Sequence, residues 1–147
     1  MAGVFDNPVF PYFAFYAIVV VLKTISMAFL TVFHRLTKRI YINPEDTRIA
    51  GGQGKVATNE TIERIRRCHQ NDIENVIPFV LIGLLYTASG PSLGSALLHF
   101  RIFTGARIFH TIAYLFALPQ PSRALSFFVG LLSIMSMAYN VLPATKY

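Results

Sequence analysis

A run of charged and polar residues leads directly into an apolar stretch between Glu60 and Tyr86, with the sequence ETIERIRRCHQNDIENVIPFVLIGLLY. Residues three, four or seven apart share one face of an α-helix, so Arg67, Asn71 and Glu74 are expected on a single face. A cation, an amide and a carboxylate are costly where a helix enters hydrocarbon, and they usually mark a functional site. Anchoring at the lipid headgroups is the alternative, and it explains the arginines better than the amide and the carboxylate.

A second polar stripe is expected in the apolar stretch 93–118, where Arg107, His110 and Tyr114 again share one helical face. His110 or Tyr114 alone would be typical of a polar group satisfied in helix packing. An arginine on the same face, deep in the stretch, favours a binding site instead. The short break PQPSR then places Arg123 just before the last apolar stretch.

These residue types suit a small zwitterion that carries more negative than positive charge. Arginine pairs with carboxylates, often through two parallel hydrogen bonds, Glu74 can accept from an ammonium group, and Asn71 can bind backbone amides. Glutathione has all of these groups and a thiol, which reacts only when it is ionised. A neighbouring arginine such as Arg123 would lower the pKa of that thiol and hold the thiolate. Another small anion fits the residue types equally well.

The composition is that of an integral membrane protein. Hydrophobic residues make up 54% of the 147 residues, and the mean hydropathy is +0.50. The net charge of +6 comes from basic residues beside apolar stretches, which is typical of the positive-inside rule rather than of a nucleic-acid-binding surface. The single cysteine, Cys68, excludes an internal disulfide, and no His or Cys spacing predicts a metal site.

Four apolar stretches predict an all-α integral membrane protein, with one domain over residues 1–147 that forms a four-transmembrane-helix bundle. The spans are expected at about 9–33, 75–88, 93–118 and 124–142, with a basic loop at 34–67. Lys23 falls near the middle of the first span, so it should face protein or water. Eight Lys and Arg lie from Arg35 to Arg67, whereas the opposite side has only Lys146, so the loop is expected in the cytosol and both termini across the membrane.

Four motifs follow one another along the chain: NPED at 43–46, ERIRRCHQNDIEN at 63–75, ARIFHTIAY at 106–114 and PQPSR at 119–123. The second closely resembles the E-R-x-x-R-A-H-x-N-D-x-E-N signature of the MAPEG membrane proteins, and the other three agree with the same family. The resemblance extends over nearly the whole chain, in order and with family-like spacing.

This resemblance implies a MAPEG-type homotrimer with one glutathione at each subunit interface, near the cytosolic side. It implies that Arg123 stabilises the thiolate, and it makes Asp46 a further catalytic candidate. The candidate glutathione-binding residues, eight from matching positions and Arg107 from its place on the second stripe, are Arg35, Arg66, Arg67, His69, Asn71, Glu74, Arg107, His110 and Tyr114. Two of these, Arg66 and His69, lie off the main stripe of their helix, so an intersubunit site is needed to collect them.

The implied activity is that of a membrane-bound glutathione transferase that conjugates glutathione to hydrophobic electrophiles and also reduces lipid hydroperoxides. The implied location is the endoplasmic reticulum membrane, with the mitochondrial outer membrane as a second location. Two alternatives stay open: a glutathione-dependent prostaglandin E synthase and a non-catalytic scaffold that presents lipid. Ala124, Phe127 and Phe128 replace a serine and aromatic and hydroxyl residues of the prostaglandin-forming members, which disfavours the first alternative.

Overall fold

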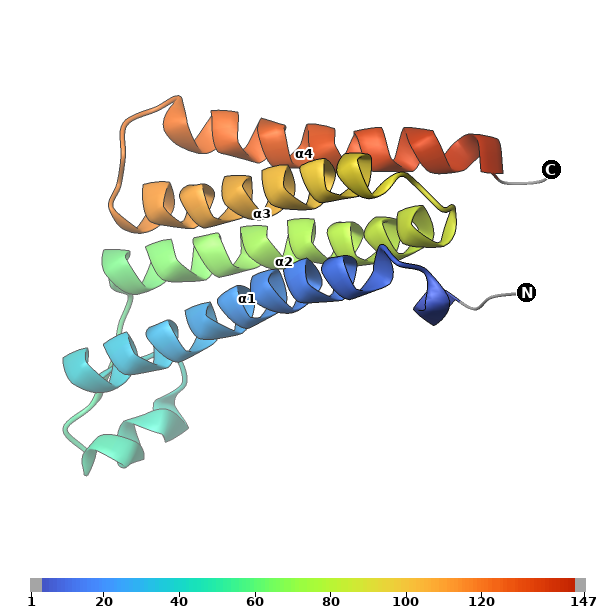
Figure 1. Cartoon of the computed structure of the whole chain (residues 1–147). Coiled ribbons are helices and arrows are strands. Elements are labelled where there is room, and N and C mark those ends of the chain that lie inside the picture. Colours follow the sequence, from blue (N-terminus) through green and yellow to red (C-terminus); the bar gives the residue numbers. More distant parts are fainter. Residues whose placement is uncertain (1–3, 145–147) are drawn as a thin grey trace.

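Four long helices lie side by side and run alternately in opposite directions in the computed structural model of the protein, which describes residues 4–144 (Figure 1). They are α1 (Phe10–Lys38), α2 (Glu60–Ala88), α3 (Leu93–Leu115) and α4 (Ser122–Val141). The shorter elements are the 3-10 helices η1 (Val4–Asp6), η2 (Pro44–Ala50) and η3 (Leu142–Ala144) and the strands β1 (Ile40–Tyr41) and β2 (Lys55–Val56). Lys146, which enters the predicted orientation, lies outside the described residues.

The helices follow the four predicted apolar stretches but differ from them at their ends. α1 continues to Lys38 and α2 begins at Glu60, the start expected from the sequence, so the connection between the two helices covers residues 39–59 and includes η2. The predicted basic loop 34–67 therefore contains the last residues of α1 and the first two turns of α2. α3 ends at Leu115 rather than at residue 118, because the backbone of Ala117 takes the left-handed conformation (φ 53°).

Two of the four helices meet a length and composition test for crossing a membrane. Within residues 4–144 these are α1 and the stretch Ser122–Ala144, which joins α4 to η3. α2 does not meet the test because its first half is highly charged, and the arginines and histidines of α3 lower the hydropathy of that helix. Spans at α2 and α3 therefore stay a prediction from the sequence.

The start of α2 is fixed by Asn59. Its side-chain oxygen accepts hydrogen bonds from the backbone N–H groups of Thr61 (3.1 Å) and Ile62 (3.3 Å), which satisfies two donors that a helix start leaves free. Glu60 and Glu63 in the first turn add a favourable interaction with the helix dipole. α2 is a single helix from Glu60 to Ala88, so its charged first half continues directly into its apolar second half.

The connection between α1 and α2 is closed by a two-residue parallel pairing of β1 with β2. The N–H of Lys55 donates to the carbonyl of Arg39 (3.0 Å), and that of Ala57 donates to the carbonyl of Tyr41 (3.2 Å). Gly54 packs so tightly on the Tyr41 ring that a Cβ at this position would lie 2.6 Å from a ring carbon. These contacts hold the two ends of the connection together.

An aromatic cluster fills the centre of the helix assembly. The rings of Phe79 (α2) and Phe103 (α3) stack with their centroids 4.0 Å apart, and both side chains are fully buried. Phe13 of α1 reaches this cluster because Gly83 has no side chain; a Cβ there would lie 2.5 Å from the Phe13 ring. Phe100 adds a ring 5.7 Å from Phe13. The cluster therefore joins α1, α2 and α3.

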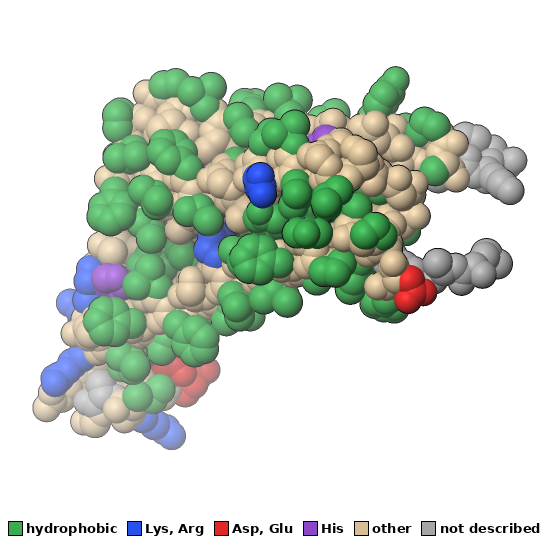
Figure 2. Space-filling view, in the orientation of Figure 1, with side chains coloured by type: hydrophobic (Ala, Val, Ile, Leu, Met, Phe, Trp, Pro, Cys, Tyr) green, Lys and Arg blue, Asp and Glu red, His purple; other side chains and the backbone are tan. Residues whose placement is uncertain are grey.

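The outer surface of the helices is apolar. Figure 2 shows hydrophobic side chains over most of the visible face, whereas Lys and Arg side chains gather mainly at the end where α1 and α2 are connected. Phe29 is 71% exposed and Leu132 is 62% exposed. Such a surface is unfavourable in water and favourable in lipid.

Candidate functional site

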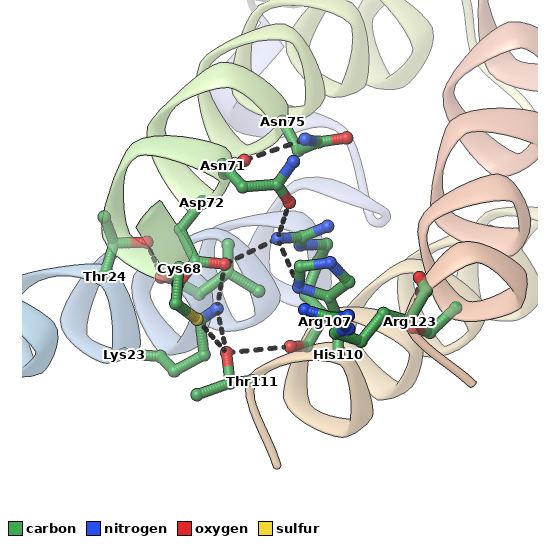
Figure 3. A network of polar contacts seen from close by, with 12 residues as sticks. Lys23, Thr24, Cys68, Asn71, Asp72, Asn75, Arg107, His110, Thr111 and Arg123 are labelled. Atoms are coloured by element: carbon green, nitrogen blue, oxygen red, sulfur yellow. Dashed lines mark hydrogen bonds and ion pairs between the residues drawn. The ribbon is translucent and has the colours of Figure 1, made fainter. Parts of the chain in front are cut away.

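A buried ionic network joins three helices next to the aromatic cluster (Figure 3). The carboxylate of Asp72 (α2) accepts from Nη2 of Arg107 (α3) at 2.7 Å and from Nζ of Lys23 (α1), both through the same oxygen, Oδ1. Lys23 also donates to the hydroxyl of Thr111 on α3 (2.9 Å). Asp72 and Arg107 are fully buried. One carboxylate thus faces two cations, so the network carries an excess of positive charge.

Arg107 connects this network to two of the predicted site residues. Its Nη2 donates to Oδ1 of Asn71 (2.8 Å) and lies 3.2 Å from Nδ1 of His110. Arg107 itself does not line the cavity in front of these two residues, because its side chain is fully buried and its guanidinium contacts α2. It therefore acts from behind Asn71 and His110 and does not itself present a surface to a ligand in the isolated chain.

An open cavity of about 260 Å³ lies in front of these two residues and is here named the Arg123 cavity. Its lining comes from α2, α3, α4 and the turn between the last two helices: Asn71, His110, Tyr114, Gln120, Arg123, Ala124, Phe127 and Phe128. The guanidinium carbon of Arg123 lies 4.9 Å from the centre of the Tyr114 ring, a cation–π distance. Nε of Arg123 is buried and has no hydrogen-bond partner among the described residues. The cavity thus combines a positive charge, polar groups and aromatic side chains.

A second cavity of about 340 Å³ lies along the charged half of α2 and is here named the α2 cavity. It is lined by Glu63, Arg66, Arg67, His69 and Gln70. Its arginines are exposed and pair with neighbours on the same helix, Arg66 with Glu63 (3.0 Å) and Arg67 with Glu60 (2.8 Å). Exposed pairs of this kind are weak, so an anionic ligand can replace the carboxylates.

The remaining predicted site residues lie apart from the Arg123 cavity. Glu74 is exposed on α2 and accepts from the side-chain amide of Gln70 (3.1 Å). Arg35 lies in the last turn of α1, with a buried Nε that has no partner among the described residues. Asp46 lies on η2 and accepts from the side-chain amide of Asn43 (3.2 Å). One chain therefore brings Asn71, Arg107, His110, Tyr114 and Arg123 together at or directly behind the Arg123 cavity, and Arg66, Arg67 and His69 together at the α2 cavity.

The direction of the buried face of α2 explains this division. Cys68, Asp72 and Asn75 are buried and define that face. Asn71 lies at its edge and is half-buried, whereas Arg67 and Glu74 lie beyond the edge and are exposed. The three residues of the predicted stripe are neighbours on the helix surface, but only Asn71 can reach α3.

The two polar stripes do not include Asp72, although its position in the sequence indicates that it is buried. Asp72 follows Cys68 by four positions and precedes Asn75 by three, so it continues the face that turns inward. A carboxylate on a buried face must be paired. The prediction that Lys23 faces protein or water is confirmed by its contact with Asp72. Within residues 4–144, no cluster of three or more His, Cys, Asp or Glu has a geometry that could hold a metal ion.

Comparison with known proteins finds one family and similar full-length proteins over nearly the whole chain. A model of the MAPEG family matches residues 13–142. The chain is 52% identical to microsomal glutathione S-transferase 1 of Homo sapiens over 152 aligned positions, which cover 100% of this chain and 97% of that protein. It is 51% identical to the protein of the same name from Rattus norvegicus, covering 97% of this chain and 94% of the relative. Prostaglandin E synthase of Homo sapiens is less similar, at 34% identity over 95% of this chain and 91% of that protein.

The match includes all four sequence motifs and every predicted site residue, since these lie between residues 35 and 123. It agrees with the resemblance inferred from the motifs, which is thereby confirmed. The chain belongs to the MAPEG family.

Proposed function

We propose that this protein is a membrane-bound glutathione transferase that holds glutathione as a thiolate and conjugates it to hydrophobic electrophiles. The observation that carries the proposal is the position of Arg123 in a cavity with two kinds of lining. Asn71 of α2 and His110 of α3 form its polar side, and Phe127 and Phe128 of α4 form its aromatic side. A thiolate at Arg123 would have polar groups for the peptide and aromatic groups for the electrophile within the same cavity. The name of the similar human and rat proteins, microsomal glutathione S-transferase 1, supports the same activity.

The role of Arg123 in this reaction is to favour ionisation of the thiol. A free thiol titrates near about 8.5, so most of it is protonated at neutral pH. A fixed positive charge lowers that pKa, and Arg123 lines the cavity in which the sulfur would lie. The proton passes to solvent, the thiolate sulfur bonds to the electrophilic carbon, and the leaving group departs with its electron pair. With a lipid hydroperoxide, two glutathione molecules supply two electrons and give a disulfide, an alcohol and water.

A substrate panel tests the proposal. Purified protein in detergent or lipid is incubated with glutathione and an aryl halide, a lipid hydroperoxide or a prostaglandin endoperoxide. We expect conjugation of the aryl halide and reduction of the hydroperoxide. Turnover of the endoperoxide alone would identify a prostaglandin E synthase instead. Binding of glutathione without any turnover would identify a scaffold.

The proposed assembly is a homotrimer with glutathione between subunits. In one chain, most candidate glutathione-binding residues line either the Arg123 cavity or the outward-facing α2 cavity, and Arg35, Glu74 and Arg107 line neither. A neighbouring subunit placed against the outer face of α2 would enclose these groups. Arginine side chains there could then pair with the carboxylates of glutathione, and Glu74 could accept from its ammonium group.

Replacing Glu74 with glutamine tests this binding mode. The substitution removes the negative charge and keeps the shape, so the ammonium group of glutathione loses a charge-assisted hydrogen bond that is typically worth about 1.5–3 kcal/mol. We expect the affinity for glutathione to fall about ten-fold or more in isothermal titration calorimetry. Glu45→Gln is the control: it removes a negative charge from η2, away from both cavities, and should leave the affinity unchanged. Unchanged affinity in Glu74→Gln would remove this residue from the site.

The proposed topology has four transmembrane helices in the endoplasmic reticulum membrane, with the mitochondrial outer membrane as a second location. The connection between α1 and α2 faces the cytosol together with the helix ends beside it, because eight Lys and Arg lie from Arg35 through Arg67. In sealed microsomes, a membrane-impermeant label should therefore modify Lys55 and leave Lys146 unmodified until the membrane is permeabilised. The reverse pattern would overturn the orientation.

A further inference from the structure

We propose that Asp72 is a positioning residue that acts through Arg107: it fixes the side chains of Asn71 and His110 so that both present N–H donors to the Arg123 cavity. This inference rests on the proposed glutathione site and names the groups that select the ligand's carboxylate. Neither Asp72 nor Arg107 lines the cavity, so both act from behind its wall.

The guanidinium of Arg107 is held through a single nitrogen, Nη2. Nη2 contacts Oδ1 of Asp72 (2.7 Å), Oδ1 of Asn71 (2.8 Å) and Nδ1 of His110 (3.2 Å) (Figure 3). Nε and Nη1 of Arg107 are buried and have no partner within residues 4–144. The orientation of the guanidinium therefore depends on one corner, where Asp72 supplies the only negative charge.

The chemistry of arginine then determines the orientation of Asn71. A guanidinium only donates hydrogen bonds, so the atom that Asn71 turns toward Arg107 must be its oxygen. The NH₂ group of the same side chain is left for the cavity, which Asn71 lines. With Arg107 in place, the amide is a donor to a ligand rather than an acceptor.

The contact with Arg107 also determines which ring nitrogen of His110 carries the hydrogen. Nδ1 lies against a donor, so it holds a lone pair, and the ring hydrogen is on Nε2. Nη2 has two hydrogens and three neighbouring acceptors, so the longest contact, to His110, is the weakest of the three hydrogen bonds. The cavity wall thus offers an amide N–H from Asn71 and an imidazole N–H from His110, and both donors favour a carboxylate.

Lys23 provides a control for the role of Asp72. It contacts the same carboxylate oxygen from the side of α1, and its hydrogen bonds within residues 4–144 go to Asp72 and Thr111 rather than to Asn71 or His110. Loss of Lys23 leaves the Asp72–Arg107 pair intact, whereas loss of the Asp72 charge frees the guanidinium. A purely structural network predicts similar effects from both changes, and a positioning role predicts different ones.

The test compares two ligands that differ only in their carboxylates. Full-length protein in lipid nanodiscs is titrated with glutathione and with glutathione diethyl ester. For Asp72→Asn, we expect the preference for glutathione over the ester to fall about ten-fold, the effect of one charge-assisted hydrogen bond. For Lys23→Met, we expect the preference to stay at the wild-type value. Equal losses for both ligands in Asp72→Asn, or equal behaviour of the two variants, would overturn the proposal.

Folding is addressed by the double variant Lys23→Met/Asp72→Asn, which removes one charge of each sign and keeps the net charge of the network. It is expected to show the same loss of preference as Asp72→Asn. A second measurement needs no ligand: ¹⁵N spectra of His110 should show the hydrogen on Nε2 in wild type and a mixture of tautomers in Asp72→Asn. An unchanged tautomer in Asp72→Asn would refute the positioning role. Failure of wild type to bind glutathione, with the tautomer shift present, would refute the proposed function alone.

Discussion

Replacing Arg123 with leucine is expected to raise the pKa of the thiol of bound glutathione by at least about one unit, which corresponds to ~1.4 kcal/mol. Leucine removes the positive charge at similar bulk, so the thiolate loses its stabilising partner while the cavity keeps its shape. The rate of conjugation at neutral pH should fall about ten-fold with the thiolate fraction. The affinity for glutathione, which we propose depends mainly on Arg67, Asn71 and Glu74, should change much less. The near-ultraviolet absorbance of the thiolate measures the titration directly.

Arg101→Leu is the matched control for this experiment. Arg101 is an exposed arginine of α3 that donates to the hydroxyl of Tyr16 (3.2 Å) and does not line the Arg123 cavity. Its removal should leave the titration unchanged. If Arg123→Leu also titrates like wild type and keeps full activity, Arg123 serves only the membrane orientation of α4, and another group stabilises the thiolate.

The second large effect is expected at Phe79, in the centre of the aromatic cluster. Phe79→Ala should lower the free energy of unfolding by about 3–5 kcal/mol, the usual cost when a buried aromatic ring is removed and leaves a cavity. The ring is fully buried and stacks on Phe103 at a centroid distance of 4.0 Å, with rings of α1 also in the cluster. No single neighbour can fill the space, because α1, α2 and α3 all pack against it.

Unfolding of the purified protein in mixed detergent micelles, followed by circular dichroism, measures this loss. Phe29→Ala is the control, because Phe29 is 71% exposed on α1 and loses little packing within the chain. A loss at Phe79 no larger than at Phe29 would show that the stacked rings do not determine the stability of the fold.

The stripe on α3 was predictable from the sequence because its members are spaced to share one face of a single helix; His110 and Tyr114 line the Arg123 cavity and Arg107 lies behind it. Arg107, His110 and Tyr114 share a face by spacing alone, and the structure brings Arg107 to His110 and His110 to Tyr114, with ring centroids 5.4 Å apart. The family was predictable as well, since the motifs lie in order along the chain. Both signals are local in sequence.

The arrangement around α2 was only partly predictable, because spacing shows which residues share a face but not the direction of that face. Arg67, Asn71 and Glu74 share a stripe, yet the inward direction is set by Asp72 and its pairing with two other helices. The positions of Arg35 and Asp46 depend on how the connection folds back, and in the proposed trimer the surroundings of the outer face of α2 would depend on a second chain. Contacts between segments distant in sequence leave no periodic pattern.

The pairing of β1 with β2 closes residues 42–54 into a loop whose two ends are held together. Since Ile40 is opposite Lys55 and Tyr41 is opposite Val56, the distance between the end of α1 and the start of α2 does not depend on the residues enclosed between them. Gly51 and Gly52 lie in that enclosed section, are exposed and have nothing near their Cα positions. An epitope or fluorescent peptide inserted between these two glycines should therefore be carried without separating the helices, and it gives the protein an attachment point from which trafficking and subunit number can be followed in living cells.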